Sequence, residues 1–122
     1  PVPHILVVDD EPDVRELVET LLAGQGYEIH GADGGKAALE RLAQHSYDVV
    51  VSDLRMPDVD GIAVYRAVQN QPTPRPAIVF MSGFTNATEF VPFLRETGAT
   101  VVAKPFDVHE LRSVVRRLVE ER

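Results

Sequence analysis

The sequence contains no cysteine among its 122 residues. It therefore has no disulfide framework and no thiolate ligands for a metal, which fits a reducing compartment such as the cytoplasm. No apolar run approaches the roughly 20 residues that a membrane-spanning helix requires, so no membrane partner is expected. The start, Pro1 to His4, lacks the charged and then apolar stretches of a secretory signal, and it has no initiator methionine. These residues fit a chain that was processed or cut from a longer one.

Positive charge is also scarce, with 12 lysines and arginines against 19 aspartates and glutamates, for a formal net charge of −7. A chain this acidic is poorly suited to nucleic acid or an anionic membrane surface as its main partner. Hydrophobic residues make up 44% and charged residues 25%, the profile of a globular protein with its own core. The length suits one compact domain and is too short for two. We therefore expect residues 1–122 to form a single domain.

Five short apolar runs are the predicted strands: His4–Asp9, Tyr27–Ala32, Tyr47–Asp53, Ala77–Ser82 and Ala99–Lys104. Four of them are continuous rather than alternating, which is typical of strands buried on both faces of a parallel sheet. The second run alternates between polar and apolar residues, so it is predicted to be an edge strand.

The segments between these runs have the period of amphipathic helices. The first helix, after Pro12, presents a stripe predicted to face inward: Val14, Leu17, Val18, Leu21 and Leu22. The fourth, Thr88–Thr97, contains Pro92 and is predicted to be short or to start late. The last has Asp107 as its N-cap and a second inward stripe: Val108, Leu111, Val115 and Leu118. The alternation predicts an α/β fold, a (βα)5 doubly wound five-stranded parallel sheet.

Polar side chains terminate the predicted strands: Asp9, Asp10, Asp53, Ser82 and Lys104. In an open parallel sheet the ligand crevice lies at the carboxyl ends of the strands. If the first and third strands are neighbours, the three aspartates converge, and charges that close repel by about 1 to 4 kcal/mol per pair. A hard cation such as Mg²⁺ relieves that repulsion. The simpler alternative is that Asp10 or Glu11 only caps the following helix.

Asp53 has the features of a phosphoryl acceptor. An aspartate at a strand end beside a bound cation can attack phosphorus and form an acyl phosphate. The transfer needs charge stabilisation on the phosphoryl oxygens, which Lys104 and Ser82 can supply together with the cation. Taken singly, Ser82 suits a turn and Lys104 suits a solvated charge. A cis Lys104–Pro105 bond would turn the lysine into the crevice, although trans is the commoner form.

Four segments resemble the signature segments of response-regulator receiver domains: Val7–Pro12, Asp53–Gly61, Phe80–Gly83 and Ala103–Phe106. They follow the family's order, and the similarity covers the whole chain. The resemblance implies a flavodoxin-like fold with strand order 2-1-3-4-5 and a cis bond after Lys104. It implies phosphorylation at Asp53, with Ser82 and Lys104 contacting the phosphoryl group. The implied ligands of Mg²⁺ are Asp9, Asp10, Asp53 and the backbone carbonyl of Arg55.

The resemblance also implies partners. The phosphoryl donor would be the phosphohistidine of a histidine kinase or of a phosphotransfer protein. An output domain or partner would bind the face formed by the fourth helix, the fifth strand and the fifth helix. The domain would assist its own phosphorylation and dephosphorylation without turning over outside substrates. Gly98 and Ala99, followed by Lys104–Phe106, are similar to receivers fused to sensor histidine kinases.

One position departs from the family. Val101 stands three residues before the lysine, where receivers usually carry an aromatic residue. Valine has a stiff χ1 and no ring to swing between buried and exposed positions. We therefore expect the phosphorylation signal to leave through the fourth helix and its approach, where Phe84, Phe90 and Phe93 supply bulk.

Two other functions stay open at this point. A phosphohydrolase with an aspartyl nucleophile normally needs a second acid two residues after it, where this chain has Arg55. A receiver-like module that binds partners without phosphate is favoured only by Val101. A dinucleotide-binding domain is disfavoured, because the turn after the first strand lacks the pattern G-x-G-x-x-G.

Overall fold

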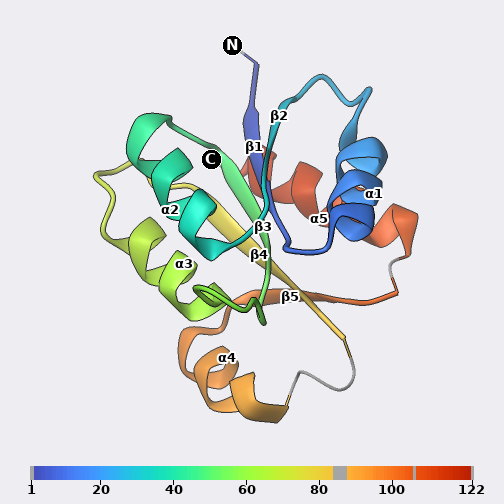
Figure 1. Ribbon diagram of the computed structural model, residues 1–122. Coiled ribbons are helices and arrows are strands. Elements are labelled where there is room, and N and C mark those ends of the chain that lie inside the picture. The colour runs from blue at the N-terminus through green and yellow to red at the C-terminus, as the bar shows by residue number, and fades with distance from the viewer. Residues whose placement is uncertain (1, 84–87, 106, 122) are drawn as a thin grey trace.

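The computed structural model describes residues 2–83, 88–105 and 107–121. Five strands alternate with helices (Figure 1). The strands are β1 (His4–Val8), β2 (Glu28–Ala32), β3 (Val49–Asp53), β4 (Ala77–Ser82) and β5 (Thr100–Ala103). The helices are α1 (Pro12–Leu22), α2 (Gly35–Gln44), α3 (Gly61–Gln69), α4 (Val91–Thr97), which follows the 3₁₀ turn η1 (Thr88–Phe90), and α5 (Val108–Glu120). Within these described ranges, no helix is long and apolar enough to cross a membrane.

The sheet has the strand order β2-β1-β3-β4-β5, and every neighbouring pair is parallel. Helices α1 and α5 cover one face, and α2 and α3 cover the other (Figure 1). This is the predicted doubly wound (βα)5 fold, and β2 is an edge strand as its alternation predicted. The order reverses between β1 and β3, so the carboxyl ends of these two strands flank the crevice of the sheet.

The central strands are apolar throughout because helices cover both of their faces. The cluster beneath α1 and α5 includes Val7, Val51, Val18 and Leu111. The cluster beneath α2 and α3 includes Leu6, Val50, Leu42 and Val64. Each of these eight side chains is at most 4% exposed, so residues of opposite parity along one strand enter opposite cores.

Two residues predicted to face the core do not. Leu17 is 49% exposed and Val108 is 37% exposed. Leu17 lies about 100° around the helix from Val18, and α1 turns Val18 and Leu22 inward, which leaves Leu17 at the margin. Val108 is the first residue of α5, and the buried residues of this helix begin one turn later, at Leu111. The predicted strands also extend too far at some ends, since β1 ends before Asp9 and β5 ends before Lys104.

The helix ends follow from capping chemistry. Pro12 occupies the first turn of α1, where its missing N–H has no helical partner to lose. Asp107 caps α5 as predicted, because its carboxylate accepts from the backbone N–H of His109 at 2.9 Å and of Glu110 at 3.2 Å. Helix α4 is short, as predicted, with Pro92 in its first turn, so no helical hydrogen bond is lost there.

A third apolar cluster joins α3, β4 and α4, and its rings form an aromatic cluster: Tyr65, Phe80, Phe90 and Phe93. The Phe93 ring lies edge-on to Tyr65 at 5.2 Å and to Phe80 at 5.7 Å between centroids. Phe90 is 5% exposed. Edge-to-face pairs of this kind add stability beyond the area they bury. Phe84, the other aromatic residue expected in this region, falls outside the described residues.

Candidate functional site

The carboxyl ends of β1 and β3 place three aspartates in one acidic group. Asp53 is the last residue of β3, and Asp9 and Asp10 directly follow β1. Because Val8 pairs with Ser52 in parallel register, Asp9 emerges beside Asp53. One carboxylate oxygen from each aspartate lies within 4.8 Å of the others. The convergence expected for neighbouring strands is therefore present.

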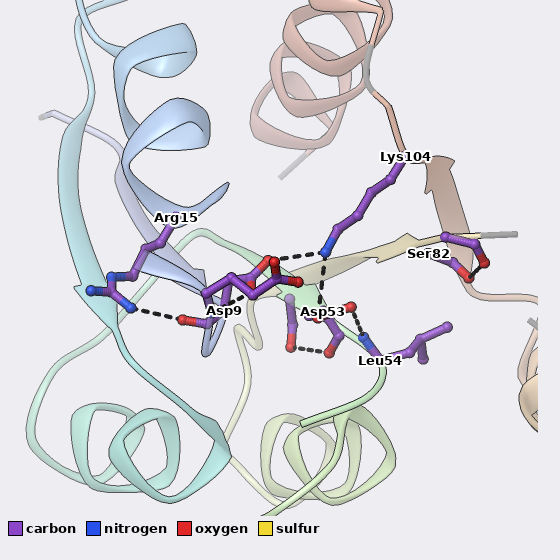
Figure 2. A network of polar contacts seen from close by, with 9 residues as sticks. Asp9, Arg15, Asp53, Leu54, Ser82 and Lys104 are labelled. Atoms are coloured by element: carbon purple, nitrogen blue, oxygen red, sulfur yellow. Dashed lines mark hydrogen bonds and ion pairs between the residues drawn. The ribbon is translucent and has the colours of Figure 1, made fainter. Parts of the chain in front are cut away.

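Lys104 reaches this acidic group from the end of β5 (Figure 2). Its ammonium nitrogen lies 3.1 Å from Oδ2 of Asp9 and 3.4 Å from Oδ2 of Asp53. Its backbone N–H donates to the carbonyl of Ser82 at 2.8 Å, which ties the end of β5 to the end of β4. The Lys104–Pro105 bond is cis, as the resemblance implies. Residues far apart in the sequence thus meet in one buried ion cluster.

The electrostatics of the cluster favour an additional cation. Burial raises the pKa of Asp53 to about 6, against the opposing charge of Lys104 and together with the charge of Asp9. Burial also acts to lower the pKa of Lys104, but Asp53 and Asp9 outweigh it, so the pKa of Lys104 is raised. The lysine is therefore charged at neutral pH, yet Asp53 still holds its proton more tightly than an exposed aspartate. Two carboxylates and one lysine leave surplus negative charge.

An open pocket of about 520 Å³ lies over the acidic group, lined by Asp10, Glu11, Asp53, Arg55, Met56 and Pro57. The atoms around it that can bind a metal are carboxylate and backbone oxygens. Hard oxygen ligands, few in number and beside open space, suit Mg²⁺, which keeps several waters and binds phosphate oxygens. The residues present therefore fit the cation that the family implies.

Ser82 lies at the same edge but does not contact the acidic group. It ends β4 and is 6% exposed. Its hydroxyl donates to the carbonyl of Gly83 at 3.2 Å. Figure 2 shows it apart from the contact between Lys104 and Asp53.

Arg55 lines the pocket, while its guanidinium forms an ion pair with the carboxylate of Glu89 in η1. The two side chains are 51% and 50% exposed. The pair connects the loop after β3 to η1. Because η1 also carries Phe90, Arg55 links the rim of the pocket to the segment that holds part of the aromatic cluster.

Gly61 supports the site in a way that sequence reasoning did not single out. A Cβ at this position would lie 2.9 Å from the carbonyl oxygen of Asp53 and 3.0 Å from the ring of Phe80. Helix α3 therefore starts directly against the end of β3. The local signal is a glycine immediately after Asp60, whose carboxylate caps α3 by accepting from Ala63 N–H at 3.2 Å.

Asp58 and Arg15 bind backbone groups beside the crevice, those of the first turn of α2 and of the loop after β1. The Asp58 carboxylate accepts from the backbone N–H of Gly35 at 3.3 Å and of Lys36 at 3.2 Å, which caps α2 from another loop. The backbone N–H of Val59, 2.7 Å from Oδ1 of Asp58, is the main contact that lowers the pKa of Asp58, and the N–H groups of Lys36 and Gly35 lower it further. Arg15 Nη1 donates to the carbonyl of Asp9 at 2.8 Å. The Asp58 contacts join residues more than 20 positions apart, so no local pattern indicates them, whereas Arg15 reaches back only six residues to Asp9.

These features define a doubly wound α/β domain whose crevice carries clustered aspartates and one lysine. The family model described as the response regulator receiver domain matches residues 5–116. The chain belongs to the response-regulator receiver domain family, and it is a phosphoacceptor domain of two-component signalling.

The curated relatives that the chain matches are longer than the chain itself. The chain is 38% identical over 117 residues to the regulatory protein AtoC of Escherichia coli, covering 96% of this chain and 25% of AtoC. It is 37% identical over 117 residues to the transcriptional regulatory protein KdpE of Mycobacterium tuberculosis, covering 93% of this chain and 51% of KdpE. The signal receiver domain of an HD domain-containing protein from Pseudomonas fluorescens superposes with a TM-score of 0.87 at 25% identity, covering 99% and 97% of the two chains. The chain thus spans a quarter of AtoC and about half of KdpE.

Proposed function

We propose that Asp53 accepts the phosphoryl group, from the phosphohistidine of a histidine kinase or of a phosphotransfer protein. The observation that carries this assignment is the position of Lys104, whose ammonium bridges Asp9 and Asp53 beside an open pocket. The ligands of Mg²⁺ are Asp9, Asp10, Asp53 and the carbonyl of Arg55. When bound, the cation neutralises charge on the acidic group and on the incoming phosphoryl oxygens.

The chemistry assigned to the chain's own residues is simple. An oxygen of the Asp53 carboxylate forms a bond to phosphorus while the P–N bond of the donor breaks, and the electron pair leaves with the imidazole. With a pKa of about 6, Asp53 is mostly ionised at neutral pH and needs no base. The Lys104 ammonium leaves the carboxylates and contacts a phosphoryl oxygen. The Ser82 hydroxyl turns away from the Gly83 carbonyl and donates to a second phosphoryl oxygen.

In this proposal the chain is a switch and not a turnover enzyme. A phosphohydrolase needs a second acid beside the nucleophile to protonate the leaving group. Arg55 stands at that position, and its guanidinium is paired with Glu89. The domain assists its own phosphorylation and hydrolysis only through Lys104, the acidic group and Mg²⁺.

Residues 1–122 act as one receiver module of the cytoplasm, with an output partner on the face formed by α4, β5 and α5. Val101 and Val108 expose apolar surface there, at 38% and 37%. The signal reaches that face through the aromatic cluster, because Val101 has no ring to move. The relatives' names describe transcriptional regulators; membership in a hybrid sensor kinase stays a prediction from the segments around Gly98 and Lys104.

Acetyl phosphate with Mg²⁺ tests the proposal on the isolated chain. Intact-mass measurement should detect one added phosphoryl group in the wild type and none in Asp53→Asn. Asp33→Asn is the matched control, because Asp33 is an exposed acid after β2 at the same edge of the sheet. Equal labelling of wild type and Asp53→Asn would remove Asp53 from the role. No labelling of the wild type would favour a phosphate-independent binding module.

A further inference from the structure

Three of the chain's four histidines gather at the opposite edge of the sheet from the acidic group. His4 begins β1, His30 lies in β2, and His45 follows α2. This edge is near the N-terminus, at the top of Figure 1. The ring of His30 lies 6.4 Å from that of His4 and 5.4 Å from that of His45, centroid to centroid. We call His4, Glu28, His30 and His45 the histidine cluster.

Strand register explains why these side chains meet. His4 is the pairing partner of Glu28 in the parallel β1–β2 ladder. Glu28 and His30 are two residues apart on β2, so their side chains leave the same face of the sheet. Both imidazoles approach one oxygen: Oε2 of Glu28 lies 2.9 Å from Nε2 of His4 and 3.3 Å from Nε2 of His30.

Tyr47 fixes the His30 ring from the other side. Its hydroxyl lies 2.8 Å from Nδ1 of His30. Tyr47 is 3% exposed, and burial raises the pKa of its hydroxyl, which therefore stays protonated. Because Nδ1 of His30 is bound to Tyr47, Nε2 is the nitrogen that faces Glu28. Such an outer contact is the usual means by which a metal-binding histidine is oriented.

We propose that His4, Glu28 and His30 bind a divalent transition-metal ion of the zinc class, with His45 as the fourth ligand. Imidazole and carboxylate ligands in this combination suit Zn²⁺, with bonds of about 2.0 Å. In a tetrahedral sphere of such bonds neighbouring ligand atoms are about 3.3 Å apart. The contact of Glu28 with His30 has that spacing, at 3.3 Å, and its contact with His4 is shorter, at 2.9 Å.

The cluster closes on binding by a small movement. Two imidazoles on one tetrahedral ion have ring centroids about 5 Å apart, and His30 and His45 are at 5.4 Å. His4, at 6.4 Å from His30, has to move inward by about 1 Å. Its side chain is 39% exposed, so it has room to turn. In the described part of the chain only the three aspartates hold ligand atoms within 4.8 Å of one another without such movement.

The cluster is open to solvent. A pocket of about 740 Å³ adjoins it, and its lining includes the whole cluster together with Pro72, Thr73 and Pro74. A hydrated ion can therefore reach the ligands. Once bound, it would clamp the edge strand β2 to β1 and to the end of α2.

Calorimetric titration of the chain with Zn²⁺, in excess Mg²⁺, tests the proposal. Excess Mg²⁺ keeps the acidic group occupied, so one Zn²⁺ per chain should bind elsewhere. His30→Ala should weaken binding roughly 100-fold, and Tyr47→Phe about tenfold because it removes only an orienting contact. His109→Ala is the control, since this remaining histidine is exposed at the start of α5, and it should leave affinity unchanged.

Titration with Co²⁺ provides a second readout, since a tetrahedral site gives strong visible absorption that Glu28→Gln should weaken. Because Glu28 is 54% exposed, this variant should fold even if His30→Ala does not. Equal Zn²⁺ affinity of His30→Ala and wild type, or loss of Zn²⁺ binding when Mg²⁺ is added, would overturn the site. Phosphoryl labelling of His30→Ala should match the wild type, which separates this inference from the role of Asp53.

Discussion

A group of polar side chains lies at each end of the parallel strands, and the two groups differ in burial. We call the carboxyl ends of the strands the carboxyl edge and the amino ends the amino edge. At the carboxyl edge, Asp9 and Asp53 are at most 5% exposed and share a lysine that is 18% exposed. At the amino edge, His4, Glu28 and His30 are 22% to 54% exposed and share no buried charge. The first group lies in the crevice between crossovers, and the second lies on the rim of an edge strand.

The difference in burial determines at which edge the repulsion between like charges persists. Buried carboxylates cannot be screened by water, so their repulsion persists until a cation, a proton or a phosphoryl group changes the charge. Half-exposed imidazoles relax into solvent and adapt to a ligand by turning. The carboxyl edge is therefore arranged to respond to phosphorylation, whereas the side chains of the amino edge can turn to bind a metal ion.

Removing the buried lysine should have the largest effect. Lys104→Met leaves Asp9 and Asp53 without their cation, and we expect the free energy of unfolding in EDTA at about pH 8 to fall by about 3 kcal/mol. His4→Ala breaks the half-exposed pair with Glu28 and should cost less than about 1 kcal/mol. Urea unfolding of both variants measures the contrast. Equal losses would mean that burial does not distinguish the two edges.

Crowding at the carboxyl edge should cost somewhat less. Gly61→Ala drives a Cβ into the Asp53 carbonyl and the Phe80 ring, so we expect a loss of about 2 kcal/mol. Gly83→Ala is the matched control at the same edge, because no atom of the described residues lies within 4 Å of its added Cβ. That control should stay within about 0.5 kcal/mol of the wild type by thermal or urea unfolding. A tolerant Gly61→Ala would show that the loop after β3 can move aside.

Neutralising the phosphoacceptor should stabilise the metal-free fold. Asp53 has a folded pKa of about 6 against 3.8 for the free side chain. The folded state therefore binds this proton more tightly, and wild-type stability falls as pH rises from about 4 to about 6. Asp53→Asn should gain about 1 to 2 kcal/mol over the wild type at pH 7.

The same difference should vanish near pH 4, where Asp53 is largely protonated in the folded state of the wild type. Unfolding in EDTA across this pH range checks the sign. Added Mg²⁺ should stabilise the wild type and leave Asp53→Asn nearly unchanged. Greater stability of the wild type at pH 7 without metal would mean that Asp53 is a structural residue.

The smallest effect expected is a redistribution of amide signals. A non-covalent phosphoryl mimic, beryllofluoride with Mg²⁺, should shift NMR signals most between residues 82 and 97 and less around Val101. Signals of His4 and His30 should not move, because the amino edge does not sense the phosphoryl group. Largest shifts on β5 would show that the proposed route through the aromatic cluster is wrong.

Local signals explain what could be predicted from the sequence. Continuous apolar runs identify strands with two buried faces, and the polar residue after each run falls at the carboxyl edge by geometry alone. The sequence pattern by itself therefore groups Asp9, Asp53 and Lys104 at one edge of the sheet. The short α4 followed equally from Pro92.

Contacts between distant segments could not be predicted in this way. The Asp58 cap on α2 and the histidine cluster both depend on how loops and strands align, to within one residue. Leu17 was misplaced because a stripe pattern does not show how wide the packed face of α1 is. The direction of the Ser82 hydroxyl depends on which acceptor is present, and no pattern encodes that.

The positions of the tyrosines have a practical consequence. The chain has three tyrosines and no tryptophan. Tyr47 touches His30 at the amino edge, Tyr65 lies against Phe93 in the aromatic cluster, and Tyr27 packs on the core beneath α1 and α5. Biosynthetic incorporation of fluorotyrosine would therefore give three resonances, one from each region. A single fluorine spectrum could follow metal capture, phosphoryl output and core integrity at once, with no engineered label.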